Sequence, residues 1–293
     1  MPATSVPIFT IPPEIIEHAL TFCHPFDVAS FSLTCRFAYY LVYHGNDSHL
    51  WRQLFLLYPF DDPRSCLKAS DDLDFIPKFN WKAELQRRIK AEEIASGTDG
   101  KAITWKFALD TFISVVQEAS PLLIGRELEP SHNIDWLTRV LENSPLFHAS
   151  ICPGDEQVLQ LLARLKSCFA LLLEGDKSIA QLKGQRSASR CYVYNLRNYR
   201  FGNDWGPFVE GGGVNWRHIE AILNVILMNL SELPGLWSIN QPPLGFHATR
   251  AYSAPDSLLR DHKDWAGIEG TWRRHVCFMD YRWVASCCEH LSH

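Results

Sequence analysis

Residues 11–59 read IPPEIIEHALTFCHPFDVASFSLTCRFAYYLVYHGNDSHLWRQLFLLYP, and their apolar side chains recur at helical spacing. The proline pair near the start favours a helix, because a proline in the first turn forfeits no internal hydrogen bond. A second helix is expected from its cap at Asp27 to Gly45, and a third ends at Pro59. The stretch therefore predicts three short helices.

These three helices carry more apolar surface than they can bury among themselves. The second has two apolar stripes, one with Val28, Phe31, Cys35, Ala38 and Val42, the other with Ala29, Leu33, Phe37, Tyr40 and Leu41. A helix that is apolar on two sides must be buried on two sides, but modules of about fifty residues bury a low fraction of their surface. The polar segment from Asp61 to Pro77 predicts that the module is held apart from the rest of the chain. We therefore expect a partner protein to cover the surplus.

Four short motifs in this stretch resemble, in order and spacing, those of the F-box family. They are Ile11-Pro12-Pro13-Glu14-Ile15-Ile16, Asp27-Val28, Leu33-Thr34-Cys35-Arg36 and Leu50-Trp51-Arg52. One departure is Ala38, where the family often has tryptophan, and we expect Phe37, Tyr39 or Tyr40 to fill that volume.

The resemblance implies a function in protein ubiquitination. F-box modules dock on the Skp-type adaptor of cullin–RING ligases, and the rest of the chain recruits the protein substrate, whose identity the sequence does not give. Residues implied in the adaptor contact, or in its support, are Ile11, Pro12, Ile15, Ile16, Leu20, Val28, Leu33, Cys35, Arg36, Leu50 and Trp51. The alternative for these side chains is an ordinary core against the C-terminal region.

The remaining chain is expected to be mainly α. We divide the whole chain into an F-box at residues 1–60, a linker and connecting helix at 61–100, and a C-terminal domain at 101–293. Asn80 caps the charged segment 81–96, which is typical of a solvated connecting helix. Further helices are predicted at 103–119, with Trp105, Leu109, Phe112 and Val116 on one stripe, and at 133–143, 155–175 and 215–230; strand-like segments are predicted at 191–201 and 270–283.

Two C-terminal segments, 193–199 and 264–282, resemble stretches that follow the F-box in a group of uncharacterised fungal F-box proteins. That likeness implies no activity or ligand. Within 186–208, arginines interleave with aromatic residues, a mixture suited to acidic or phosphorylated segments and to single-stranded nucleic acid, while an ordinary edge strand is the plainest interpretation. Candidate substrate-binding residues are Arg190, Arg197, Tyr199, Arg200 and Trp205.

Bulk properties exclude several other classes. The chain has 293 residues, of which 46% are hydrophobic, and its net charge of -5 argues against nucleic acid or anionic membrane as general partners. We see no secretory signal or membrane span, and the nine cysteines form no C-x-x-C pair, so cytoplasm or nucleus is expected. Cys287, Cys288, His290 and His293 have no second ligand cluster, and we predict no metal or cofactor.

Catalytic motifs are also missing from the sequence. The glycines at 211–213 precede a helix but lack the following Lys-Ser/Thr of a phosphate-binding loop, and Asp261, His262 and Asp264 lack a nucleophile at usable spacing. We therefore expect no enzyme activity in the chain itself. Two alternatives stay open: an F-box protein that uses the adaptor as a scaffold outside a ligase, and an enzyme whose active site is unrecognised.

Overall fold

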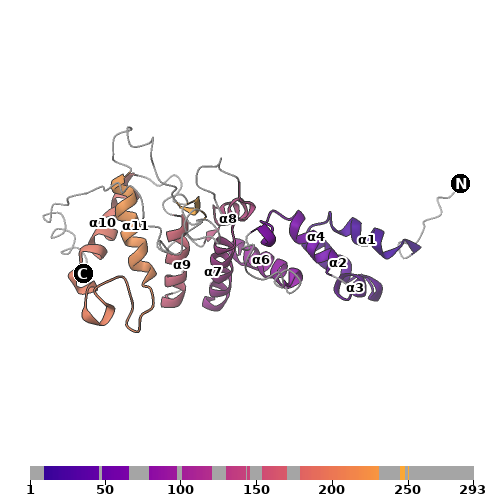
Figure 1. The fold of residues 1–293 in the computed structure, drawn as a ribbon, viewed down its shortest axis with the longest axis horizontal. Helices are drawn as coiled ribbons and strands as arrows, with labels where there is room; N and C mark the ends of the chain where they lie inside the picture. The colour runs from indigo at the N-terminus through magenta and orange to yellow at the C-terminus, as the bar shows by residue number, and fades with distance from the viewer. Residues whose placement is uncertain are drawn as a thin grey trace, which may run out of the picture.

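The computed structural model is an elongated row of helices, with α1 to α4 at one end and α10 and α11 at the other (Figure 1). It describes residues 10–45, 48–65, 79–97, 101–120, 130–142, 144–145, 154–169, 179–230, 245–247 and 250. Within these ranges the regular structure is helical, apart from an isolated bridge between Phe208 and Val214. The predicted mainly α class is confirmed.

The first of the N-terminal helices is α1 (Pro13–Leu20), which starts at the proline pair as predicted. The expected second helix is wrong as a single element, because the chain forms α2 (Pro25–Ser32) and α3 (Arg36–Tyr43). Between them, the Thr34 hydroxyl donates to the Phe31 carbonyl at 2.7 Å, and Cys35 is extended. Side chains that bond nearby backbone groups in this way compete with helix continuation.

Caps explain where α2 and α3 begin. The predicted cap at Asp27 is wrong: His24 Nδ1 accepts from the Phe26 N–H at 3.3 Å, and Asp27 lies inside the first turn. Cys35 caps α3 instead, since its Sγ accepts from the Ala38 N–H at 3.4 Å.

The last N-terminal helix is α4 (His49–Leu57), which buries Leu50, Trp51, Leu54 and Phe55. Trp51 Nε1 donates to the Val42 carbonyl at 2.9 Å and so ties α4 to α3. The four N-terminal helices therefore enclose a small core of their own.

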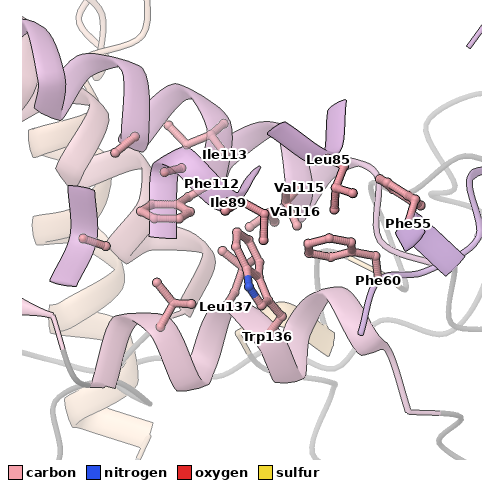
Figure 2. Close-up of a cluster of buried hydrophobic side chains, with 14 of the residues drawn as sticks. Phe55, Phe60, Leu85, Ile89, Phe112, Ile113, Val115, Val116, Trp136 and Leu137 are labelled. Atoms are coloured by element: carbon pink, nitrogen blue, oxygen red, sulfur yellow. The ribbon is translucent and has the colours of Figure 1, made fainter. Parts of the chain in front are cut away.

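That core continues without a break into the next helix, α6 (Trp81–Ser96). The Phe55 ring lies 5.4 Å from Trp81, and Phe60 lies 5.1 Å from Trp136. Figure 2 shows Phe60 and Phe112 around Trp136 in this cluster. The expectation of a module held apart is thus wrong, because the bulky side chains of 55–60 are packed against the rest of the chain.

Helix α6 is also more than a connecting element, contrary to the sequence expectation. Asn80 does cap it, with Oδ1 accepting from the Ala83 N–H at 3.0 Å. However, Trp81, Leu85, Arg88, Ile89, Ala91 and Ala95 are buried, and the helix contacts both α4 and α7 (Ala102–Gln117). Its charged composition is misleading because one of those charges, Arg88, is itself inside the core.

The C-terminal helices pack in series. From α7 the row continues through α9 (Glu156–Phe169) to α11 (Trp216–Leu230) and α10 (Ile179–Tyr194), while α8 (His132–Glu142) covers α6 and α7. The predicted stripe of Trp105, Leu109, Phe112 and Val116 is buried on α7, and α9 lies between α7 and α11 as a central helix. Asn215 caps α11, with Oδ1 accepting from the His218 N–H at 3.2 Å.

The strand-like segment predicted at 191–201 is helical instead. Its first residues complete α10, and two 3-10 turns follow, η5 (Leu196–Asn198) and η6 (Phe201–Asn203). Alternation of aromatic and polar residues over so few positions fits the end of a helix as well as a strand. The second strand-like segment, at 270–283, lies outside the described residues. No described helix has the length and apolar character needed to cross a bilayer.

Candidate functional site

A set of large apolar side chains on the N-terminal helices is open to solvent. Leu33 is 83% exposed and Phe22 is 73% exposed. We name the whole set the exposed apolar surface: Ile15, Phe22, Phe26, Leu33, Phe37, Tyr39, Tyr40 and Leu57. Exposed apolar side chains that lie next to one another mark interaction sites, and within this set the Tyr39 and Tyr40 rings lie 6.1 Å apart.

The two stripes predicted on residues 28–42 differ in burial, although Leu41, from the more exposed stripe, is partly buried against the core. Val28, Ala38 and Val42 are buried in the core of the N-terminal helices. Leu33 and Tyr40, from the other stripe, are exposed. The surplus expected from the sequence is therefore real, although the two stripes are distributed over α2, α3 and the break between them.

The residues that the sequence implied in adaptor contact fall into two groups. Buried or partly buried are Ile11, Ile16, Leu20, Val28, Leu50 and Trp51, which form or border the core beneath the surface, and Cys35, which caps α3. Exposed are Pro12, Ile15, Leu33 and Arg36, which are available to a partner. Direct contact thus fits the second group, and support of the contact fits the first.

Ala38 is buried, whereas the aromatic residues next to it in the sequence are exposed. It is fully buried, and its N–H is bonded to the capping Cys35. Phe37, Tyr39 and Tyr40 lie at adjacent positions of α3 and are directed outward, because successive residues of a helix point in different directions. The expectation that one of them substitutes for the missing tryptophan at Ala38 is therefore wrong.

Sequence reasoning did not single out Phe22, Phe26 or Leu57, which belong to the same surface. Phe22 follows α1 and packs edge-on against His18, with ring centroids 5.2 Å apart. Phe26 opens α2 and stacks on His24 at 5.3 Å. Large apolar residues at or beside helix ends were the available signal, since helix ends have fewer neighbours to cover them.

The five candidate substrate-binding residues divide in a similar way. Arg190 Nη2 donates to Asn229 Oδ1 at 3.2 Å, and the Tyr199 hydroxyl donates to the Val193 carbonyl at 2.7 Å, so both hold the fold. Arg197, Arg200 and Trp205 are exposed. Among the described residues, the side chains of Arg197 and Arg200 form no ion pair, and Arg200 Nε donates to the Arg197 carbonyl at 2.8 Å.

These exposed residues belong to one loop, residues 195–214. Asn203 Nδ2 donates to the Asn198 carbonyl at 2.6 Å, and the Trp205 N–H donates to the Arg200 carbonyl at 3.0 Å. Asp204 and Trp205 both have positive φ, 52° and 57°. Left-handed backbone at two successive non-glycine residues is strained, and it persists only where surrounding bonds impose it.

The glycines at 211–213 complete this loop. Gly211 and Gly212 have φ of 98° and 90°, and the Val209 N–H donates to the Gly213 carbonyl at 2.8 Å. They form a tight turn that closes the bridge between Phe208 and Val214. Only glycine adopts such φ values without strain. The turn therefore explains why glycine occurs at 211 and 212, and phosphate binding is not needed as a reason.

The metal and catalytic candidates named from the sequence lie in its C-terminal part. Among the described residues, no group of three or more His, Cys, Asp or Glu side chains is placed to hold a metal ion. The cysteines and histidines at 287–293, and Asp261, His262 and Asp264, lie outside the described residues.

Comparison with known proteins identifies the N-terminal helices. A family model for the F-box domain matches residues 8–45, a segment that includes α1, α2 and α3. The recognition made from the four sequence motifs is confirmed for this domain. No curated protein and no solved structure matches the chain.

Proposed function

Because this chain carries an F-box domain at residues 8–45, we propose that it is the substrate-recruiting subunit of an SCF-type cullin–RING ubiquitin ligase. F-box domains mediate binding to Skp-type adaptors and thereby to a cullin. In this proposal the exposed apolar surface docks on the adaptor, and the C-terminal region recruits a protein to be ubiquitinated. The chain needs no catalytic residue, since other subunits transfer ubiquitin, and it acts in the cytoplasm, the nucleus or both.

The observation that carries the docking half is the exposure of Leu33 beside a complete core. Each large apolar side chain left in water forfeits about 1.5–3 kcal/mol relative to burial. Val28 and Val42 show that these helices can bury apolar side chains efficiently. Leu33 and Ile15 are exposed, so the fold itself does not require an apolar residue at either position. Apolar residues at such positions are the expected pattern for a surface that a partner covers.

The recruitment half rests on the loop at the other end of the row of helices (Figure 1). Its exposed apolar side chains, Leu196, Phe201 and Trp205, lie in the same loop as the exposed Arg197 and Arg200. Guanidinium groups pair bidentately with carboxylate or phosphate, and aromatic side chains anchor interfaces. We therefore assign this loop to an acidic or phosphorylated segment of the substrate that also carries an apolar anchor.

A matched pair of variants tests adaptor docking. Leu33→Asp places a charge on the exposed apolar surface, and Leu196→Asp does the same at the far end, at a leucine that is also 83% exposed. Co-purification with a Skp-type adaptor is expected to be lost for Leu33→Asp, alone or with Ile15→Asp, and retained for Leu196→Asp. Equal adaptor recovery from both variants would contradict the proposal.

Cullin recovery separates a ligase subunit from a scaffold. A ligase subunit brings down cullin together with the adaptor, whereas a scaffold that uses the adaptor outside a ligase brings down adaptor alone. Affinity purification from cells with the ubiquitin pathway inhibited, followed by mass spectrometry, reports both proteins and any recruited substrate. Adaptor without cullin in repeated purifications would overturn the ligase assignment and favour the scaffold.

A further inference from the structure

An open cleft of about 200 Å³ lies between the N-terminal helices α2, α3 and α4 on one side and α6 on the other. Its apolar lining comes from both parts: Phe26 and Ala29 on α2, Tyr43 on α3 and Trp51 on α4, with Leu85 and Ile89 on α6. The exposed side chains of Gln86, Lys90 and Glu93 add polar groups to the lining. An apolar centre bordered by polar residues is the usual composition of a protein interface.

The size of the cleft narrows the class of occupant. Pockets for small molecules usually measure about 300–1,000 Å³ and enclose most of the ligand. The present cleft is smaller and open, which suits a single large side chain better than a metabolite. Interface anchors are of this kind: one apolar or aromatic side chain in a pocket, with near-neutral contacts around it.

The cleft is continuous with the exposed apolar surface. Phe26 belongs to both, since it is half exposed and also lines the cleft. On α3, the Tyr40 and Tyr39 rings lie 6.1 Å apart, and Tyr39 lies 5.1 Å from Tyr43 in the cleft lining. A partner that covers Tyr40 and Tyr39 therefore reaches the cleft along an unbroken series of aromatic rings.

The lining from α6 is held rigidly relative to the F-box helices. The Tyr43 ring stacks on Trp51 at 5.8 Å, and Lys82 Nζ, from α6, lies 4.5 Å above the Tyr43 ring. The Tyr58 hydroxyl, just beyond α4, donates to Glu92 Oε2 at 3.1 Å. The cleft is thus formed before any partner arrives, and a preformed pocket lowers the entropic cost of binding.

We propose that this cleft receives one apolar side chain of the adaptor, so that α6 forms part of the adaptor interface although it lies outside the F-box domain at residues 8–45. This inference rests on the proposed docking function. It assigns Gln86 and Lys90 of α6 to the border of the contact, and Ala29 and Ile89 to its centre.

Filling the cleft tests the inference with the full chain and a purified Skp-type adaptor. Ala29→Trp occupies the space from α2, and Ala188→Trp adds the same bulk to an exposed position of α10 at the far end. If the cleft holds an anchor, the Kd for the adaptor rises about tenfold or more in Ala29→Trp and is unchanged in Ala188→Trp. Calorimetric titration measures both values.

The outcomes separate two kinds of failure. A wild-type chain that does not bind adaptor overturns the docking function and this inference with it. A wild-type chain that binds, together with an Ala29→Trp variant of unchanged Kd, overturns the cleft assignment alone.

Lysine footprinting gives a second measurement that needs no substitution near the F-box core. Lys90 borders the cleft and is exposed, and Lys183 is exposed on α10. Acetylation of Lys90 is expected to fall at least about fivefold when saturating adaptor is bound, while Lys183 reacts unchanged. Undiminished labelling of Lys90 in the complex would overturn the inference even if Ala29→Trp weakens binding. The lower adaptor affinity of that variant would then arise from a structural change in α2.

Discussion

Arg88 Nη2 donates to Glu118 Oε2 at 2.6 Å and thereby joins α6 to the C-terminal end of α7. Only 1% of Arg88 is exposed. Its Nε donates to Glu84 Oε1 at 2.7 Å and its Nη1 to Asn133 Oδ1 at 3.0 Å, while the guanidinium carbon lies 4.6 Å from the centre of the Phe60 ring. A single charged side chain therefore contacts α7, α8 and the segment that follows α4.

Replacing this guanidinium is expected to be costly. Arg88→Met removes a buried donor from Asn133 Oδ1, from Glu84, which is 15% exposed, and from Glu118, which is 44% exposed. Each hydrogen bond that involves a charged group typically contributes about 1.5–3 kcal/mol. Arg87→Met is the matched control, since Arg87 also pairs with Glu84 but its side chain is 30% exposed; its expected cost is about 1 kcal/mol or less. Urea denaturation measures both, and similar losses for the two variants would contradict a structural role of Arg88.

Asp61 provides another polar connection between the N-terminal helices and the remaining helices. Its carboxylate accepts from the Ser120 N–H at 2.8 Å, the Ser131 hydroxyl at 2.6 Å and the His132 N–H at 2.7 Å. Asp61→Ala leaves these donors unsatisfied, and each buried unpaired group costs about 1–3 kcal/mol. We expect a loss of about 3 kcal/mol or more in unfolding free energy.

The neighbouring residue provides the control for this prediction. Asp62 pairs with Arg64 near the surface, so Asp62→Ala should change the unfolding free energy by less than about 1 kcal/mol. Thermal unfolding by circular dichroism compares the two variants. A comparable shift in Tm for both variants would show that the buried hydrogen bonds of Asp61 do not stabilise the contact between the N-terminal helices and the remaining helices.

Buried His218 predicts a pH-dependent stability. Burial lowers the pKa of His218 below its ordinary value of 6.5, and its Nε2 lies 3.1 Å from the Tyr199 hydroxyl. The unfolded chain thus takes up a proton near pH 6.5, whereas the folded chain does so only at lower pH. The stability tied to neutral His218 is present above pH 6.5 and is lost as the pH falls through the folded-state value.

Substitution isolates this contribution. His218→Gln removes the titrating group, so the difference in unfolding free energy between wild type and variant should narrow as the pH decreases from about 7.5 to 5. Urea denaturation at several pH values measures that difference. A constant difference over this range would contradict the assignment.

Local composition predicted most of the helices and the surplus apolar surface, because both depend on short-range spacing. The stripe from Trp105 to Val116 and the exposure of Leu33 are examples. It missed α10 and the division between α2 and α3. The prediction failed where a residue far away in the sequence determines whether a side chain is buried. Arg88 is an ordinary surface residue by type, and only Glu118 and Asn133, brought in by later helices, allow its burial.

The same reason explains the errors at Asp61 and in the segment 191–201. A polar, proline-containing stretch indicates a linker, but Asp61 bonds groups about sixty to seventy residues away, which spacing cannot reveal. At 191–201, Tyr199 bonds Val193 and contacts His218, so tertiary contacts select turns over a strand. The cleft beside α6 was equally inaccessible, since its lining is assembled from four helices.

Trp205 offers a test of recruitment that separates binding from stability. Its side chain is 65% exposed and its φ is 57°, so the residue adds strain and little burial. Trp205→Gly relieves the left-handed backbone, which costs a non-glycine residue of order 1 kcal/mol or more, and the gain is partly offset by the greater freedom of the unfolded chain. We therefore expect an unfolding free energy within about 1 kcal/mol of wild type, together with reduced capture of substrate.

Asp204→Gly is the matched control, because it relieves the adjacent strained residue, with φ of 52°, and leaves the aromatic side chain in place. Proximity labelling in cells with the ubiquitin pathway inhibited compares the proteins recovered by each variant. We expect the Trp205→Gly variant to lose a set of proteins that the wild-type chain recovers, and the Asp204→Gly variant to retain that set. If both variants recover the wild-type set while remaining folded, the substrate contacts another part of the chain, and the strain at 204–205 has no role in recognition.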